Sequence, residues 1–403
     1  MINQIEIASE QKDSNLASTL AHETRKNNIG RILFLSMCVM VAIAGATIMT
    51  SCNGENGEDE VDYENGSQNG NGNGNETSNV DVYVAGNARH FNNIQVAALW
   101  KNGVIQYLSE QFSTARSVFV SGSDVYVAGF GLLKNGVQQN LTTDYDWSAR
   151  SVFVSGSDVY VAGTEFWVSP YGSGSISNAV SWKNGELQYR LTDVQNLGAN
   201  FHANSVFVSG SDVYVAGVVG NSGATLWKNG VEQNLSQTNN DNDDYYSSAN
   251  SVFVAGDDVY VAGYESWSDN YGYYYNAAIL WKNGVAQSLS QTNHDDYDYY
   301  SSSANSVFVS GSDVYVAGGE YLHNEDGEGI RFVTLWKNGV TQHLSDEINY
   351  GEANSVFVLG DDVYVGGVGT VANGNIGGIL WINGVAQNLS NAGEVYSVFV
   401  VPK

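Results

Sequence analysis

The residues best suited to bind a ligand stand directly before the copies of a repeated Ser-Val-Phe-Val segment. The copies begin at Ser117, Ser151, Ser205, Ser251, Ser306, Ser355 and Ser397. The residues before them are Arg116, Arg150, Asn204, Asn250, Asn305, Asn354 and Tyr396. If equivalent positions ring a common centre, two neighbouring guanidinium groups meet there and are suited to hold a carboxylate or a sulfate. The alternative is structural, because asparagine favours the turn before a strand and arginine pairs with nearby acids.

A second group of candidates consists of aromatic residues in the segments that vary between copies. Tyrosine and tryptophan combine a flat apolar face with a polar edge, which suits sugar rings and protein surfaces alike. The candidates are Tyr245, Trp267, Tyr273, Tyr274 and Tyr299. The alternative is that these polar, aromatic segments only keep a large secreted domain soluble.

No recognisable catalytic motif occurs in the chain. The histidines are scattered, and neither a Gly-x-Ser-x-Gly elbow, a phosphate loop nor a His-Glu-x-x-His segment is found. The acidic runs at 241–244 and 294–298 lack the spacing of a calcium loop and are interpreted as solvated charge. The sequence therefore predicts no catalytic residues, no metal site and no cofactor. A carboxylate pair of the glycosidase kind stays open, because a sequence does not reveal the separation of two acids.

The elements that position these residues are short β-strands. Each Ser-Val-Phe-Val run is followed, after a Ser-Gly-Ser-Asp turn or a variant of it, by Val-Tyr-Val-Ala, which is typical of a hairpin. A third run ends at Trp-Lys-Asn-Gly in most copies, and Asn-Gly favours a type I′ turn into a fourth strand. Each copy is therefore predicted to form one four-stranded antiparallel sheet.

The spacing of the copies predicts the fold class. The Asp-Val-Tyr-Val starts lie between 34 and 55 residues apart, which is typical of propeller blades. The repeat region begins with a second strand near residue 80 and ends with a first strand at Ser397. We therefore expect an all-β, seven-bladed β-propeller over residues 80–403, with the C-terminal strand joining blade 1 and closing the ring.

The repeat resembles the kelch family of β-propellers, in which an inner strand is followed by a hydrophobic strand ending in Gly-Gly. Gly366-Gly367 keeps this doublet, whereas the other copies have Ala-Gly. The resemblance implies that Ser-Val-Phe-Val is the innermost strand and that the variable connections share one face. These connections are the segments 164–178, 237–250, 264–276, 291–305 and 319–331. The resemblance transfers no function, because propellers have many.

The N-terminus predicts export and a lipid anchor. Arg25, Lys26 and Arg31 precede an apolar run at 32–49. Met49-Thr50-Ser51-Cys52 resembles a bacterial lipobox, which implies a signal peptide over 1–51 and acylation of Cys52; the alternative is an uncleaved helix. Residues 52–79 are interpreted as a disordered Asn/Gly/Glu tether. Acids after Cys52 resemble an export signal, so we expect outer-membrane anchoring that faces the cell exterior, or else the periplasm.

Composition narrows the partners. The 403 residues carry a net charge of −27, which excludes the basic surface that nucleic acid requires. Taken together, the sequence predicts a monomeric, non-catalytic binding or adhesion module for a surface glycan or a protein. One alternative is a carbohydrate-active hydrolase or lyase, and another is a scaffold subunit of an envelope assembly. Carboxylates facing a pocket would favour the enzyme.

Overall fold

The computed structural model describes residues 79–403, within one compact unit that spans Asn75–Lys403. The gaps are 91–93, 112, 144, 169–174, 193–200, 221–222, 237–245, 269–273, 291–296, 325–328, 346–349 and 371–373. The predicted signal peptide, Cys52 and the tether up to residue 78 lie outside the described residues. Within the described part of the chain, no helix has the length and apolarity needed to cross a bilayer.

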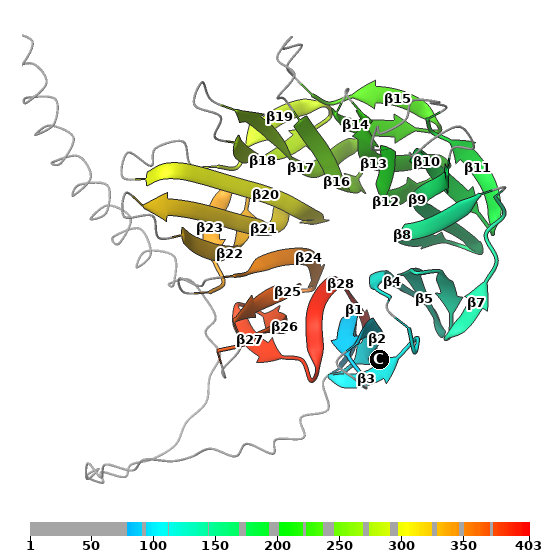
Figure 1. The fold of residues 1–403 in the computed structure, drawn as a ribbon, viewed down its shortest axis with the longest axis horizontal. Helices are drawn as coiled ribbons and strands as arrows, with labels where there is room; N and C mark the ends of the chain where they lie inside the picture. Colours follow the sequence, from blue (N-terminus) through cyan, green and yellow to red (C-terminus); the bar gives the residue numbers. More distant parts are fainter. Residues whose placement is uncertain are drawn as a thin grey trace, which may run out of the picture. The chain divides into compact units, whose positions relative to one another are not determined.

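The fold is all-β and is built from groups of four antiparallel strands around a common centre (Figure 1). The first strand of each group is innermost and contains the Ser-Val-Phe-Val segment. Its valines alternate with less buried residues, as expected for a strand that packs on its neighbours. The first strands are β4 (Ala115–Ser121), β8 (Asp146–Ser155), β12 (Phe201–Ser209), β16 (Tyr246–Ala255), β20 (Tyr297–Ser310), β24 (Glu352–Leu359) and β28 (Ala392–Pro402).

The second strand of each group is a nearly continuous apolar run because it is covered on both faces by neighbouring sheets. It carries the Val-Tyr-Val-(Ala/Gly)-Gly sequence. The second strands are β1 (Val80–Arg89), β5 (Asp124–Gly129), β9 (Asp158–Val168), β13 (Asp212–Val219), β17 (Asp258–Ser268), β21 (Asp313–Asn324) and β25 (Asp362–Thr370).

The third strand carries a tryptophan near its end in all groups but one. Six such indoles, exemplified by Trp227, are fully buried, and Leu133 takes the place of the seventh. The third strands are β2 (Gln95–Lys101), β6 (Leu132–Lys134), β10 (Ser175–Lys183), β14 (Gly223–Lys228), β18 (Tyr274–Lys282), β22 (Gly329–Lys337) and β26 (Ile376–Ile382).

The fourth strand is short and lies on the outside. An Asn-Gly pair with positive φ at both residues, 51–53° for asparagine and 78–88° for glycine, leads into it and confirms the predicted turn. The fourth strands are β3 (Val104–Tyr107), β7 (Val137–Gln139), β11 (Glu186–Arg190), β15 (Val231–Asn234), β19 (Val285–Ser288), β23 (Val340–His343) and β27 (Val385–Asn388).

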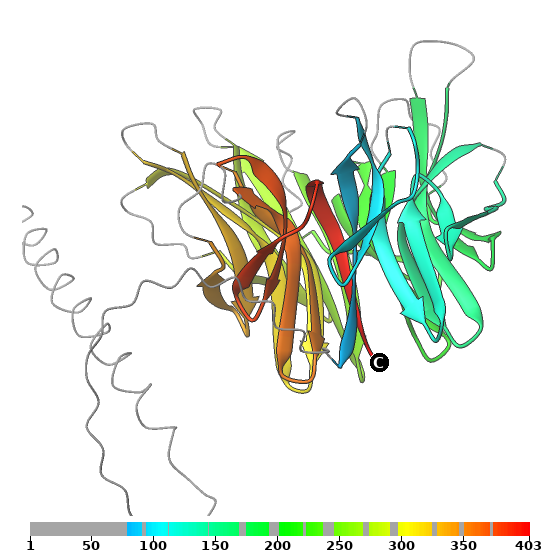
Figure 2. The same ribbon diagram turned by 90° about the horizontal axis from the view of Figure 1, so that it is seen from below.

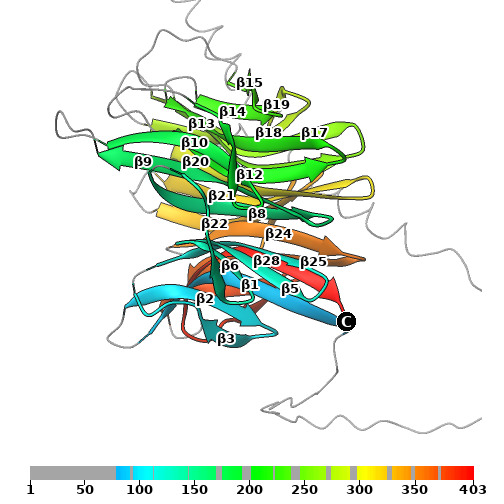
Figure 3. The ribbon, with the colours of Figure 1, turned by 90° about the vertical axis from the view of Figure 1, so that its right-hand side faces the viewer.

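The strand order agrees with the predicted four-stranded sheets. Within each group the strands pair in the order first, second, third, fourth, and one parallel bridge between Asn276 and Ser301 joins two groups into an eight-stranded sheet. The first strand beside β1 is the C-terminal β28, with Val82 opposite Val400. Figure 3 shows these two strands, from opposite ends of the described chain, running side by side.

Two sets of contacts connect the first strands at the centre. The phenylalanines of Ser-Val-Phe-Val contact one another in series, with ring centroids 4.6–5.0 Å apart, and Phe399 contacts both Phe357 and Phe119. The serine of each copy accepts a hydrogen bond of 3.0–3.2 Å from the first valine N–H of a neighbouring copy; Ser397 Oγ accepts from Val118 N–H. Both series return to the strand where they begin.

A polar cluster fixes the hairpins at the end of the groups where the C-terminus lies in Figure 2. In the group formed by β12 to β15, Asn229 Oδ1 accepts from Val213 N–H at 2.8 Å and Asn229 Nδ2 donates to Asp212 Oδ1 at 2.8 Å. Lys228 Nζ pairs with Asp212 at 2.7 Å and lies over the Tyr214 ring. The side chain of the asparagine in the next hairpin therefore accepts the backbone N–H at this turn, and the aspartate binds the asparagine and the lysine.

A β-bulge interrupts each first strand directly before its serine. In β12, Ala203 pairs with Gly217 and Ser205 pairs with Ala216, so Asn204 is the extra residue. The same register shift occurs at all seven copies. The glycine opposite the bulge is required, because a Cβ at Gly217 would overlap the carbonyl oxygen of His202. The repeated Ala-Gly or Gly-Gly doublet therefore specifies the bulge.

Replacing this glycine should destabilise the fold. In Gly217→Ala the new methyl group has to displace the backbone of β12, which we expect to cost about 2 kcal/mol or more. Urea unfolding followed by tryptophan fluorescence measures the difference. A loss below about 0.5 kcal/mol, the usual range of surface substitutions, would show that the bulge does not depend on glycine.

Candidate functional site

The bulged residues line one cavity at the centre of the fold. Its volume is about 460 Å³. The seven residues predicted to meet, Arg116, Arg150, Asn204, Asn250, Asn305, Asn354 and Tyr396, all belong to its lining. They are joined there by His202, Val218, Tyr246 and Ser248. These positions do not form a turn before the strand, because the strand runs through them and each is the extra residue of a bulge.

One side of the cavity is basic. Arg116 and Arg150 come from the neighbouring strands β4 and β8, and His202 comes from β12. Burial, with a contribution from Arg116, lowers the pKa of Arg150 to about 10. Burial and the two arginines lower the pKa of His202 to about 4, so its imidazole is neutral at pH 7. His202 Nδ1 is 3.0 Å from Thr164 Oγ1.

Two carboxylates, on β24 and β28, bind to residues of the cavity wall. Glu352 Oε1 accepts hydrogen bonds from Ser303 Oγ at 2.6 Å and from Asn305 Nδ2 at 2.8 Å. Glu394 accepts from Asn354 Nδ2 at 3.2 Å and from the Tyr396 hydroxyl at 2.7 Å. Three of these donors, Asn305, Asn354 and Tyr396, line the cavity, so each carboxylate is anchored directly behind its wall.

The two carboxylates share surroundings. Burial raises the pKa of Tyr350, and the charges of Glu394 and Glu352 act in the same direction, whereas Arg331 opposes them. Burial and Glu394 raise the pKa of Tyr396. Both glutamates therefore act on the pKa of the same tyrosine.

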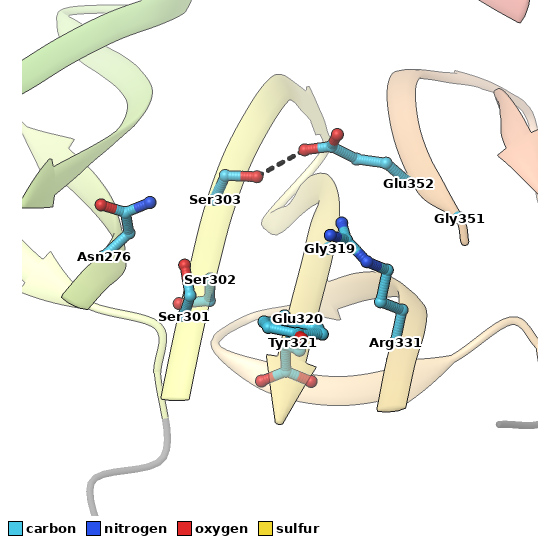
Figure 4. A pocket seen from close by; sticks show the side chains of 10 residues that line it. All are labelled: Asn276, Ser301, Ser302, Ser303, Gly319, Glu320, Tyr321, Arg331, Gly351 and Glu352. Atoms are coloured by element: carbon cyan, nitrogen blue, oxygen red, sulfur yellow. Dashed lines mark hydrogen bonds between the residues drawn. The ribbon is translucent and has the colours of Figure 1, made fainter. Parts of the chain in front are cut away.

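A second pocket, of about 330 Å³, adjoins Glu352 (Figure 4). Arg331 extends into it from β22, and its guanidinium lies 4.6 Å from the Tyr321 ring centroid. Glu320 also belongs to the lining, but Figure 4 shows its side chain directed away from Glu352. Its carboxylate accepts from Tyr300 and Thr334 and contacts His343 Nε2 at 2.8 Å. Glu320 therefore has a structural role, and Glu352 is the carboxylate that faces this pocket.

The predicted aromatic residues do not join this site in the part of the chain that the structure describes. Trp267 is exposed on β17 and stacks on Tyr275 at 6.1 Å. Tyr274 lies in β18 and Tyr299 in β20, but their side chains are outside the described part of the structure. Tyr245 and Tyr273 lie wholly outside the described residues. The aromatic residue that does line the cavity is Tyr246, and part of each supposed variable loop is strand.

Three further candidate residues, His202, Glu352 and Glu394, escaped the sequence prediction although the repeat marks their positions. They occupy the position three residues before the repeated serine, which holds Thr114, Ser148, His202, Ser248, Ser303, Glu352 and Glu394. Four copies have a hydroxyl there, and the other three break the repeat with titratable groups. In the described residues no cluster of three or more histidines, cysteines and acids has the geometry of a metal site.

Comparisons with known proteins give structural likeness without a family. No family model and no curated protein matches the chain. A puromycin-hydrolyzing peptidase from Mycobacterium tuberculosis has a TM-score of 0.48 and 11% identity over 77% of this chain and 51% of the peptidase. The Pyrococcus horikoshii acylaminoacyl peptidase has a TM-score of 0.40 and 12% identity over 78% of this chain and 51% of the peptidase. An exo-1,5-alpha-L-arabinanase from a bovine ruminal metagenomic library has a TM-score of 0.30 and 11% identity over 57% of this chain and 98% of the arabinanase.

These neighbours correct the functional expectation. The chain spans about half the length of the two peptidases, and all three neighbours are hydrolases. The prediction of a non-catalytic binding or adhesion module is corrected on this point, since the three neighbours are hydrolases, but TM-scores of 0.30–0.48 assign no activity to this chain. At these identities the likeness concerns the all-β fold, and the reaction has to be argued from the residues of this chain.

The half-buried imidazole of His202 makes the stability of the fold depend on pH. His202 has its pKa lowered from 6.5 to about 4 in the folded state, so the unfolded chain binds a proton more readily. The stabilisation from the neutral form is present above pH 6.5 and is lost as the pH falls towards 4. In His202→Gln, we expect a smaller loss of unfolding free energy between pH 7 and pH 4.5. His90→Gln, outside the cavity, is the control; an unchanged slope in His202→Gln would contradict the assignment.

Proposed function

We propose that the chain is a carbohydrate-active hydrolase that acts at the central cavity, with Glu352 and Glu394 as its acid and base. The observation that supports this most is their register. They stand at equivalent positions of β24 and β28, where four other copies have serine or threonine, and each is held by residues of the cavity wall. Such a repeat-breaking pair serves chemistry that an exact repeat does not provide.

The proposed chemistry follows from two carboxylates that residues of the cavity wall hold in place, of which Glu352 also faces the second pocket. One carboxyl group protonates the glycosidic oxygen as the bond breaks, and the other activates water or attacks the sugar carbon. Hydrogen bonds from Asn305 and Ser303 orient Glu352, and those from Asn354 and Tyr396 orient Glu394. Positioning of this kind lowers the entropic part of the barrier.

Neutralising either carboxylate should abolish hydrolysis. The wild-type protein is incubated with arabinan, xylan, galactan and polygalacturonate, and release of reducing ends is measured. On the best substrate we expect Glu352→Gln and Glu394→Gln each to reduce kcat by about a hundredfold or more, with little change in KM. Glu232→Gln, on the exposed strand β15, is the control. Failure to cleave any of the four polymers, or full activity of both variants, would refute the proposal.

We also propose the finer architecture: a seven-bladed β-propeller whose ring is closed by β28 in the sheet of β1, β2 and β3. The pairing of β28 with β1 and the two series of contacts that return to their starting strand support it. The cavity then depends on closure, because Tyr396 and Glu394 belong to β28.

Closure predicts complementation. A chain that ends before Ala392 lacks β28, so we expect it to lose the cooperative unfolding transition. A peptide of residues 392–403 added in trans should restore that transition, whereas the same residues in scrambled order should not. A truncated chain that unfolds like the full chain would contradict closure.

A further inference from the structure

The two arginines of the central cavity carry more than a structural role. Arg116 and Arg150 occupy the same bulge position on the adjacent strands β4 and β8, so their side chains leave the sheets at the same depth. Both line the cavity. The chain has only 16 basic residues against 43 acids, yet two of the bases meet here. Like charges placed together are costly unless an anion compensates them.

Within the described residues, neither guanidinium has a carboxylate partner. Arg150 Nε is buried and donates to no hydrogen-bond acceptor, and Arg150 Nη1 donates to Asn204 Oδ1 only at 3.5 Å. Arg116 lies against the Tyr396 ring, 5.6 Å from its centroid, which leaves its N–H groups without an ionic partner. By contrast, Lys228 and its equivalents in the hairpins pair with aspartates at 2.7–2.8 Å.

The surrounding lining adds polarity without a competing anion. His202 is neutral at pH 7, and Asn204, Tyr246 and Ser248 contribute amide and hydroxyl groups. The nearest carboxylate along the wall, Glu394, is separated from Arg116 by Tyr396, whose ring contacts the arginine and whose hydroxyl donates to the glutamate. Tyr396 therefore lies between the basic side of the cavity and the carboxylate behind its wall.

We propose that Arg116 and Arg150 form an anion subsite that binds a carboxylate or sulfate group of the substrate, so that the substrate class is an acidic glycan. This inference rests on the proposed hydrolase site. The anionic group of one sugar lies against the two guanidiniums, and the adjoining sugar extends past Tyr396 towards Glu394 and Glu352. The subsite thus sets which linkage reaches the carboxylates. Paired guanidiniums suit such oxyanions because each offers two parallel N–H donors.

Binding to an inactive protein tests the subsite apart from the reaction. Trigalacturonate, a sulfated galactose trisaccharide and neutral galactotriose are titrated calorimetrically into Glu352→Gln. We expect an anionic trisaccharide to bind more tightly than the neutral one, with affinity that falls as salt rises. Adding Arg116→Gln and Arg150→Gln to this variant should lower the affinity for the anionic trisaccharide by about tenfold or more. The affinity for the neutral trisaccharide should change by less than about twofold. The two anionic arms identify the carboxylate or the sulfate as the group bound.

Arg89→Gln, which removes the same charge from an exposed residue outside the cavity, is the matched control. Its affinity for the anionic ligand should equal that of Glu352→Gln alone. The subsite is overturned if neither anionic trisaccharide binds, if the double arginine change leaves their affinity unaltered, or if Arg89→Gln weakens them equally. If anions bind as expected but no polymer is cleaved, the subsite stands and the hydrolase proposal fails.

Discussion

The β-bulge before each Ser-Val-Phe-Val segment is the constraint on which the rest of the structure depends. It can form because Gly217 and its equivalents have no Cβ. A Cβ at these positions would overlap a carbonyl oxygen of the bulged strand. The serine that follows accepts a hydrogen bond from the neighbouring first strand, so each bulge is fixed relative to the next. An extra residue in the strand directs a side chain to the centre. Repetition of this unit builds a cavity wall from one side chain per sheet.

The same repetition explains why the site is polarised. Equivalent positions of a repeat usually hold the same residue type, and the candidate functional residues stand where one copy differs from the others. Arg116, Arg150 and His202 fall on three successive first strands, whereas Glu352 and Glu394 fall on two others that are also successive. Basic side chains therefore line one arc of the cavity, and the two carboxylates stand behind the adjoining part of its wall. A polar, partly enclosed space strengthens both fields relative to water.

Much of this was accessible from sequence. Asn-Gly turns, alternating valines and the repeat spacing predict the four-stranded sheets, and the residues before each serine were correctly expected to meet. The bulge was not predicted, because Asn204 also fits a turn. Only the pairing of its neighbours, Ala203 with Gly217 and Ser205 with Ala216, distinguishes a bulge from a turn. Glu352 and Glu394 were missed because acids are abundant in this chain, and their role depends on neighbours such as Asn305 that are distant in sequence. The exposed Trp267 shows the converse: composition suggested binding at a residue outside the cavity wall.

A crystal structure of Glu352→Gln soaked with an acidic oligosaccharide tests the central claim, that the residues at and before the bulges form the substrate site. The account predicts sugar density in the central cavity, with an anionic group against Arg116 and Arg150 and a glycosidic oxygen beside residues 352 and 394. Density confined to the outer surface, with the central cavity holding only solvent, would contradict it.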